Sequence, residues 1–506
     1  MTVFRLLVVA LVSFALNAPP AHAQTYDLPS LGDAAGEELP PAMERRLGEQ
    51  IMLQVRRDPS YLPDPESTEY LNNLAYRLVA VSPSRSLDFV FFIIRDPMLN
   101  AFALPGGFIG VHSGLVVTAQ TESELASVLG HEIGHVTQRH IARMIARQKE
   151  SAAMAIGTLL LAILAARAGG SSGGDLAQAA ILGGQAAMIQ QQLNFSREAE
   201  READRVGFQT LTEAGFDGRG MEAFFARMQA GTRIYEGTAP AYLRTHPMTV
   251  ERISDMQNRT RSLPFKQRAD SLEFQLVRAR LRVLQETSLQ GWRDTLEYFN
   301  GQVSNRTTHN EYAARYGAAV AALKLNMPEV ALQNAQAAKR MAPGNSVLLD
   351  KLVSEARFAG ARDDTERAEV VKLAQEIAAR YPLSGVAAHH YVDLMLKTNR
   401  HEDAIAFLRN QQAITRDQPA YFSLLGRAYE ALNRKSLQHQ AVAEMYAHFG
   451  ALSPAIQQLE LARRANDGDF YTMSEIDARL RDLRTEFRRE QETLRDAGKR
   501  SPDGGR

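Results

Sequence analysis

Apolar and polar positions alternate with different periods in different parts of the chain. Apolar residues recur at helical spacing over 43–56 and 68–79, which predicts two amphipathic helices. Residues 87–94 (LDFVFFII) are rich in β-branched and aromatic side chains and predict a buried strand. Residues 100–117 predict a β-hairpin, with its turn at Pro105-Gly106-Gly107.

A long helix is predicted directly after this hairpin. Thr121-Glu122-Ser123-Glu124 has the form of a capping box, and Leu125, Val128, Leu129 and Ile133 then repeat on one face. From about residue 270 onward the pattern is helical and nearly free of strand signals. The predicted fold is therefore mainly α with a small β-sheet.

The C-terminal half carries a weak internal repeat. Ala331, Ala368, Ala404 and Ala441 are spaced 37, 36 and 37 residues apart, and each is followed by a helix and then by a proline, namely Pro343, Pro382, Pro419 and Pro454. This period is close to that of tetratricopeptide repeats, so 270–490 is predicted to form an α-helical tetratricopeptide-like solenoid. An irregular helical bundle is the alternative. The charged residues 491–506 are predicted to be a disordered tail.

The N-terminus has the three parts of a secretory signal. Arg5 gives a positive start, 6–16 are almost wholly apolar, and Ala21-His22-Ala23 forms a small-x-small cleavage site. Residues 1–23 are therefore predicted to be a signal peptide cleaved after Ala23, which places the rest of the chain in the periplasm. An uncleaved anchor helix is the alternative, although the apolar run is short of the ~20 residues that span a bilayer.

Residues 151–193 differ from their surroundings because two apolar runs flank a Gly/Ser-rich linker. The first run is too short for a comfortable membrane span. Three interpretations stay open: helices packed on the core, a lid or plug over a cleft, or a segment that contacts a membrane surface.

Composition narrows the chemistry. The 506 residues hold 58 basic and 58 acidic side chains, so the net charge is zero and nucleic acid is not expected as a partner. Cysteine is absent, which excludes disulfides, thiol nucleophiles and cysteine-ligated metal sites. Any metal must therefore be held by histidines and carboxylates.

The strongest chemical signal is the sequence His131-Glu132-Ile133-Gly134-His135. Positions i and i+4 of a helix project from one face, so both imidazoles can bind one metal ion, which suits zinc. A surface histidine–glutamate pair is the alternative, but two histidines and a glutamate inside an apolar helix are costly without a partner. On a continuous helix His140 lies about 140° from His135 and is predicted to be solvated.

A third ligand is expected from the carboxylate-rich segment 198–204. Glu200 and Asp204 share a helix face, so that Glu200 can bind the metal while Asp204 orients a ligating histidine. The spacing alone does not choose Glu200 over Glu198 or Glu202, and most such charged runs are solvated faces.

These two motifs together resemble a known peptidase family. HExxH followed some 65 residues later by Glu-x-x-Ala-Asp (200–204) is similar to the family that includes the CAAX prenyl endopeptidases and the HtpX heat-shock protease. The segment starting at Asn100 also resembles the strand that borders the cleft in that family. The resemblance implies a gluzincin-type zinc metallopeptidase domain over 24–265, with one Zn²⁺ per chain, Glu200 as third ligand and Asp204 in support.

A third segment fits the same family. Arg244-Thr245-His246-Pro247 and the following Arg252-Ile253 resemble its HPxxxxRI motif. The resemblance implies that His246 occupies the fourth position on the zinc and keeps the enzyme latent. Stabilisation of the oxyanion is the other role open to His246. Arg252 either anchors this loop or contacts the transition state.

The secretory signal and the repeats resemble the periplasmic members of this family. They imply a zinc endopeptidase and chaperone that promotes assembly of outer-membrane β-barrel proteins or degrades misassembled ones, with Glu132 as general base. An extended substrate is expected to pair with a strand edge at 102–111. The repeats are expected to contact the outer-membrane assembly machinery (the BAM complex).

A non-enzymatic function is the alternative. In that reading the helical repeats form a scaffold or adaptor at the assembly machinery, and the zinc centre is mainly structural. An intramembrane prenyl-protein protease is disfavoured because the chain lacks several long apolar spans.

Overall fold

The computed structural model describes residues 39–84, 87–147, 196–234, 241–261, 263–264, 268–308, 310–414 and 418–499. The described residues are mainly helical and contain one three-stranded sheet, as the sequence predicts. None of the helices in these ranges has the length and apolar character needed to cross a membrane. The predicted signal peptide and the segment 151–193 lie outside the described residues.

The sheet consists of β1 (Val90–Ile94), β2 (Ala101–Leu104) and β3 (Phe108–His112), in the order β1-β3-β2. β3 pairs parallel to β1, with Phe108 opposite Val90, and antiparallel to β2, with Val111 opposite Ala101. Since β3 has a neighbour on each side, a pairing edge at 108–111 is ruled out. The edge left on that side is β2.

The hairpin prediction is correct for its turn and wrong for its end. Gly106 and Gly107 have φ of +75° and +90°, in the region that favours glycine. The predicted strand was too long, because Ser113–Thr118 form a short helix, α5. The chain leaves the sheet there since the Ser113 hydroxyl and the Gly114 amide both donate to the carbonyl of Asp96.

The helices that surround the sheet centre on α6 (Glu122–Thr137). The Thr121 hydroxyl accepts from the Glu124 amide and the Glu124 carboxylate accepts from the Gln120 amide, so the predicted capping signal starts this helix. Every residue from Glu122 to Val136 is buried, because α6 packs against β2 on one side and other helices elsewhere. The other helices of this region are α3 (Pro41–Val55), α4 (Pro65–Val79), α7 (His140–Arg147), α10 (Arg197–Glu213), α11 (Arg219–Ile234), α12 (Ala241–Thr245) and α13 (Val250–Arg261).

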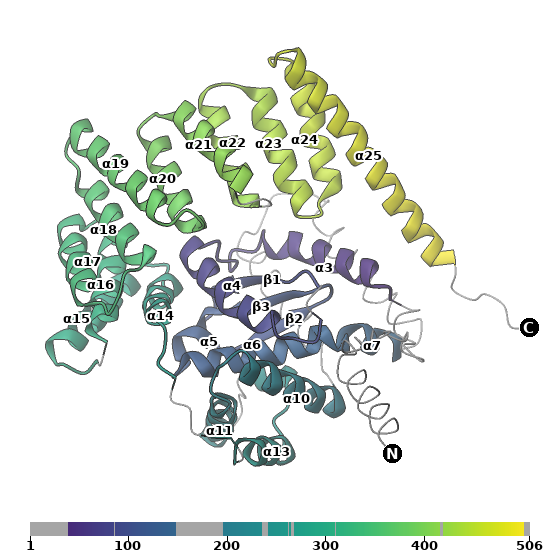
Figure 1. The fold of residues 1–506 in the computed structure, drawn as a ribbon, viewed down its shortest axis with the longest axis vertical. Coiled ribbons are helices and arrows are strands. Elements are labelled where there is room, and N and C mark those ends of the chain that lie inside the picture. Colours follow the sequence, from purple (N-terminus) through teal and green to yellow (C-terminus); the bar gives the residue numbers. More distant parts are fainter. Residues whose placement is uncertain are drawn as a thin grey trace, which may run out of the picture.

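The remaining helices form an array of sequential antiparallel neighbours. Figure 1 shows it arching past α3 and α4, which it contacts: the Glu69 carboxylate on α4 accepts from the amide of Val386 and the hydroxyl of Ser384. Its members are α14 (Leu272–Gln285), α15 (Leu289–Ser304), α16 (Glu311–Lys324), α17 (Pro328–Met341), α18 (Val347–Gly360), α19 (Asp364–Arg380), α20 (Gly385–Lys397), α21 (His401–Ile414), α22 (Pro419–Ala431), α23 (Lys435–His448), α24 (Leu452–Ala465) and α25 (Phe470–Lys499).

Two details of the predicted repeat region need correction. Ala331, Ala404 and Ala441 are buried, but Ala368 is exposed, because α19 starts at Asp364 and presents Val371 to the core instead. The disordered tail predicted for 491–506 is wrong for 491–499, which continue α25. Six of its nine residues (QETLRDAGK) are good helix formers, namely Gln, Glu, Leu, Arg, Ala and Lys.

Candidate metal centre

Small residues let α6 and α10 approach each other backbone to backbone. A Cβ added at Gly134 would lie 2.9 Å from the carbonyl oxygen of Ala203, and one at Gly207 would lie 2.8 Å from the amide of His131. Both distances are shorter than real Cβ contacts. This close crossing places the carboxylates of α10 opposite the histidines of α6.

Four donor side chains converge at that crossing. His131, His135, Glu200 and His246 each offer one donor atom, and these atoms all lie within 4.8 Å of one another. The two Nε2 atoms of the α6 histidines are 3.0 Å apart. Glu200 Oε1 lies 3.4 Å from His135 Nε2 and 3.0 Å from His246 Nδ1. All four residues are buried.

The charge of this cluster fits a divalent cation. Three carboxylates are buried here: Glu200 and Asp204 pair with the guanidinium of Arg252, whereas Glu132 lies beside His246. With neutral imidazoles, two negative charges stay uncompensated, and neither oxygen of Glu132 accepts a hydrogen bond from a described side chain. Buried acceptors of this kind are costly unless a cation binds them.

The carboxylates on α10 set the protonation of their neighbours. Burial alone lowers the pKa of His131, but hydrogen bonds to Asp204 and Glu200 outweigh it and raise the pKa to about 9. Burial opposes ionisation of Glu200, whereas the charge of His246 and the hydrogen bonds from the histidines hold its pKa well below the usual range. The pKa of His135 is lowered by its burial.

Asp204 and Arg252 form the support behind the donors. Asp204 Oδ1 lies 2.9 Å from His131 Nδ1, so it can hold the ring with Nε2 towards the centre. The Arg252 guanidinium donates to both oxygens of Asp204 at 2.6 and 2.8 Å, to Glu200 Oε2 at 2.7 Å and to the Pro247 carbonyl at 2.9 Å. These protein groups occupy the guanidinium, which favours the anchoring role over contact with a transition state.

His246 is held directly after α12. Its ring stacks on Tyr242 with centroids 4.6 Å apart, and its Nε2 lies 3.5 Å from Glu132 Oε1. Burial raises the pKa of Glu132 against the opposing charges of His246 and His131. Glu132, the expected general base, therefore lies beside His246, the residue expected to block the metal centre.

The prediction of a solvated His140 is wrong. Its side chain is fully buried, with Nδ1 2.9 Å from His135 Nδ1 and Nε2 3.1 Å from Glu202 Oε2. The prediction assumed one continuous helix, but α6 ends at Thr137 and Arg139 has a left-handed φ of 52°. The chain turns there, and α7 returns His140 beneath His135.

The structure also separates the three glutamates that spacing left open. Glu200 faces the histidines, Glu198 is 72% exposed, and Glu202 points to His140 and Arg143. Sequence reasoning missed Tyr242 and the role of Glu202, for which no motif gave a signal.

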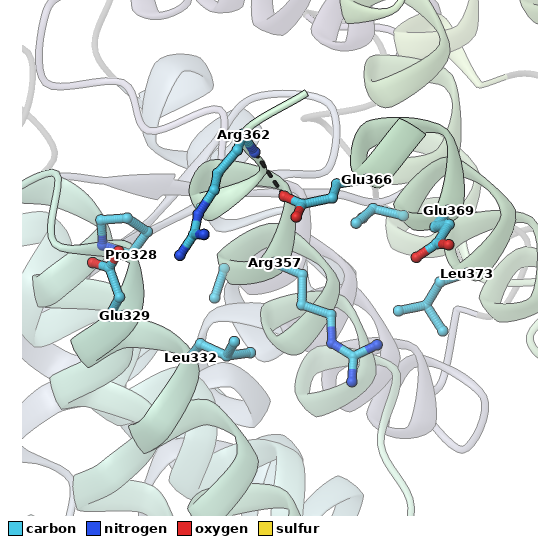
Figure 2. A pocket seen from close by; sticks show the side chains of 11 residues that line it. Pro328, Glu329, Leu332, Arg357, Arg362, Glu366, Glu369 and Leu373 are labelled. Carbon is cyan, nitrogen blue, oxygen red and sulfur yellow. Dashed lines mark hydrogen bonds between the residues drawn. The ribbon is translucent and has the colours of Figure 1, made fainter. Parts of the chain in front are cut away.

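A separate pocket of about 500 Å³ lies in the helical array. Figure 2 shows charges of both signs around it, including Arg357, Arg362, Glu366 and Glu369 from α18, α19 and the loop between them. Apolar side chains such as Leu332 and Leu373 complete the wall. The pocket shares no residue with the metal centre.

Comparison with known proteins gives the same assignment. Residues 65–260 match the model of peptidase family M48. The beta-barrel assembly-enhancing protease of Escherichia coli (strain K12) is 33% identical over 472 residues, which cover 92% of this chain and 93% of that protein. Its namesake from Yersinia pestis is 30% identical over 466 residues, covering 90% and 91%. The mitochondrial metalloendopeptidase OMA1 of Schizosaccharomyces pombe is 31% identical over 220 residues, covering 42% and 60%.

The family resemblance predicted from the motifs is confirmed by these matches. The two assembly-enhancing relatives are named as proteases and match over nearly the whole chain, repeats included, and the relative named as a metalloendopeptidase matches over 42% of it. The chain therefore belongs to peptidase family M48 and is a metalloprotease.

Proposed function

We propose that this chain is a zinc-dependent endopeptidase and chaperone, held latent by His246 and acting in the periplasm on outer-membrane β-barrel proteins. The observation that carries the proposal is the buried convergence of His131, His135, Glu200 and His246. Three nitrogens and one carboxylate oxygen are the donor set that zinc prefers.

His131, His135 and Glu200 would hold the metal, and Glu132 and Asp204 have supporting tasks. Zinc, when bound, supplies a Lewis acid that polarises a peptide carbonyl and acidifies water. Glu132 accepts a proton from the attacking water and returns it to the leaving amine. Its raised pKa, caused by burial, brings a carboxylate closer to the pH at which such transfer is efficient. Asp204 fixes the tautomer of His131, and Arg252 holds Asp204.

Latency follows from the closed donor set. Sites with four protein ligands are typically structural, whereas catalytic sites keep one position open. His246 provides the fourth donor here, and its stacking on Tyr242 keeps the ring in place. We infer that His246 must leave before a substrate can bind. A role in stabilising the oxyanion after that movement is the other outcome to test.

The client class is proposed from the relatives, and the compartment from the predicted signal peptide. Proteins that share nearly the full length of this chain are named for enhancing β-barrel assembly. The edge strand β2 packs beside α6, and such an edge can pair with an extended segment through backbone hydrogen bonds alone. Cleavage of a signal peptide after Ala23 and binding of the assembly machinery (the BAM complex) by the repeats belong to the same proposal.

Two domain ranges and one role stay predictions: the metallopeptidase domain at 24–265, the repeats at 270–490, and the role of the segment 151–193. That segment is a lid or plug, a membrane-contacting element or part of the core.

A scaffold without catalysis is the second candidate, favoured by the completeness of the four-donor set. The two candidates separate in one experiment. Purified full-length protein is analysed for zinc and incubated with casein, with Glu132→Gln and His246→Ala as variants.

We expect one zinc per chain in all three proteins. Glu132→Gln should lose digestion, and His246→Ala should digest faster than the unaltered protein. Equal digestion by Glu132→Gln and the unaltered protein would refute the mechanism. A slower His246→Ala would instead assign His246 to the transition state. No digestion by any of them, with zinc bound, would favour the scaffold.

A further inference from the structure

His140 connects the metal centre to the surface through a second imidazole. Its Nδ1 lies 2.9 Å from His135 Nδ1 and its Nε2 lies 3.1 Å from Glu202 Oε2. Glu202 is partly exposed and accepts from the Arg143 guanidinium at 2.7 Å. The buried ring therefore bridges a proposed metal ligand and a carboxylate 62 residues along the chain.

The protons along this path have one consistent arrangement. His135 Nε2 faces His131 and Glu200, so a bound metal takes the lone pair of Nε2 and the ring proton must sit on Nδ1. His135 Nδ1 then donates to His140 Nδ1, which must accept. His140 consequently carries its proton on Nε2 and donates to Glu202. Each hydrogen bond fixes the tautomer of the next group.

We propose that His140 is a positioning residue that fixes the tautomer and ring orientation of the metal ligand His135, with Glu202 anchoring its outer end. This inference rests on the proposed function. The two ligands on α6 are then supported differently, since His131 contacts Asp204 directly whereas His135 reaches its carboxylate through an imidazole. Such outer partners typically change metal affinity 10–100-fold when removed.

The test measures zinc affinity rather than proteolysis. Full-length protein and its variants compete for Zn²⁺ with a chromophoric chelator, and Co²⁺ substitution reports ligand geometry through its visible absorption. We expect His140→Ala to weaken zinc binding about 10–100-fold and to alter the cobalt spectrum. His140→Asn keeps an acceptor where Nδ1 stood and should recover most of the affinity. Glu202→Gln should cost less than His140→Ala.

His390→Ala is the matched control. His390 is a buried histidine on α20 whose Nε2 lies 2.9 Å from the Ser354 hydroxyl, within the helical array. The substitution His390→Ala removes a comparable buried hydrogen bond and should leave the zinc affinity unchanged. A drop equal to that of His140→Ala would show that any lost buried imidazole weakens the centre, and would overturn the proposal.

The remaining outcomes separate this inference from the proposed function. If His131→Ala weakens zinc binding while His140→Ala matches the unaltered protein in affinity and cobalt spectrum, the positioning role is refuted alone. If His131→Ala also has no effect, the metal centre itself is wrong. Should His140→Ala fail to fold by circular dichroism, His140→Leu takes its place, because it fills the volume but offers no acceptor to His135 Nδ1; unchanged zinc affinity in His140→Leu refutes the role.

Discussion

Two clusters of buried charge in this protein are built in opposite ways. One is the metal-centre cluster described above. The other, here called the linking cluster, consists of Asp64, Glu66, Arg280 and Lys351. Arg280 on α14 lies 2.7 Å from Asp64 Oδ1 and 3.0 Å from Glu66 Oε1, and Lys351 on α18 also pairs with Glu66. This cluster joins α4 to the helical array.

The difference lies in how completely each cluster is paired. The linking cluster has two acids and two bases, Lys351 pairs in addition with the half-exposed Glu355 at 2.8 Å, and none of the cluster's atoms is among the unpartnered buried atoms of the described chain. The metal centre has an excess of acid and leaves both carboxylate oxygens of Glu132 without a side-chain hydrogen bond. Charges that hold helices together are balanced within the protein, whereas charges kept for a ligand are left short of a partner.

The sharpest test of that contrast removes one unpartnered charge. Glu132→Gln should reduce proteolysis by about 10²–10⁴-fold, the usual contribution of general base catalysis. It should also leave the metal-free protein as stable as before, or more stable, because an unpaired buried carboxylate is lost. Casein digestion and chemical denaturation measure the two effects.

Glu198→Gln is the control for this variant, since its side chain is 72% exposed on the same helix as Glu200. It should change neither activity nor stability. If Glu132→Gln destabilised the metal-free protein by several kcal/mol, the carboxylate would be structural and the contrast between the clusters would disappear.

The opposite result is expected in the linking cluster. Arg280→Met leaves Asp64 and Glu66 buried with less compensation, and breaking a buried pair in this way costs about 3–5 kcal/mol. Chemical denaturation should report the loss. Arg282→Met on the same helix is the control, because that guanidinium lies over the Tyr298 ring at 4.5 Å and contributes about 1 kcal/mol. Equal losses of stability in the two variants would show that the ion pairs of Arg280 contribute no more than the contact between Arg282 and Tyr298.

Metal removal tests whether the missing partner is a cation. At free zinc a thousandfold above its dissociation constant, binding to the folded state alone adds about 4 kcal/mol, and a chelator should remove that amount. Thermal unfolding with and without zinc measures it. Arg280→Met should lose the same increment as the unaltered protein, since independent clusters contribute additively. Unfolding that is insensitive to chelator would contradict a metal at this centre.

The two clusters also differ in what the sequence could predict. His131 and His135 are one helical turn apart, so local geometry alone brings them together. Glu200 needed the family resemblance, because spacing did not distinguish it from Glu198 or Glu202. The linking cluster gave no signal at all, since Arg280 and Asp64 are 216 residues apart and meet only through tertiary packing.

His140 shows a third kind of limit. A single left-handed residue, Arg139, breaks the helix, so that the side chain of His140 points towards the metal centre and not into solvent. The prediction assumed that one helix continues from His135 to His140, and this assumption fails at Arg139. The small sheet and the helical array were predicted correctly because they depend on periodicity over many residues.

The smallest effect expected concerns a histidine beside the linking cluster. Burial and the nearby charge of Lys351 lower the pKa of His390 to about 3. A balanced cluster therefore tolerates this histidine only when it is neutral. In the unfolded chain His390 titrates near its ordinary pKa of 6.5, so its contribution to stability is complete above pH 6.5 and is lost as the pH falls towards 3.

Between pH 7.5 and pH 5 this loss amounts to about 2 kcal/mol, because the unfolded state binds a proton that the folded state refuses. His390→Gln cannot titrate and keeps a polar group near Ser354, so its free energy of unfolding should fall less over that interval by the same amount. Denaturation of both proteins at the two pH values measures the difference. Parallel pH profiles would mean that the folded protein accepts the extra positive charge, and the linking cluster would then be less strictly balanced than its contacts indicate.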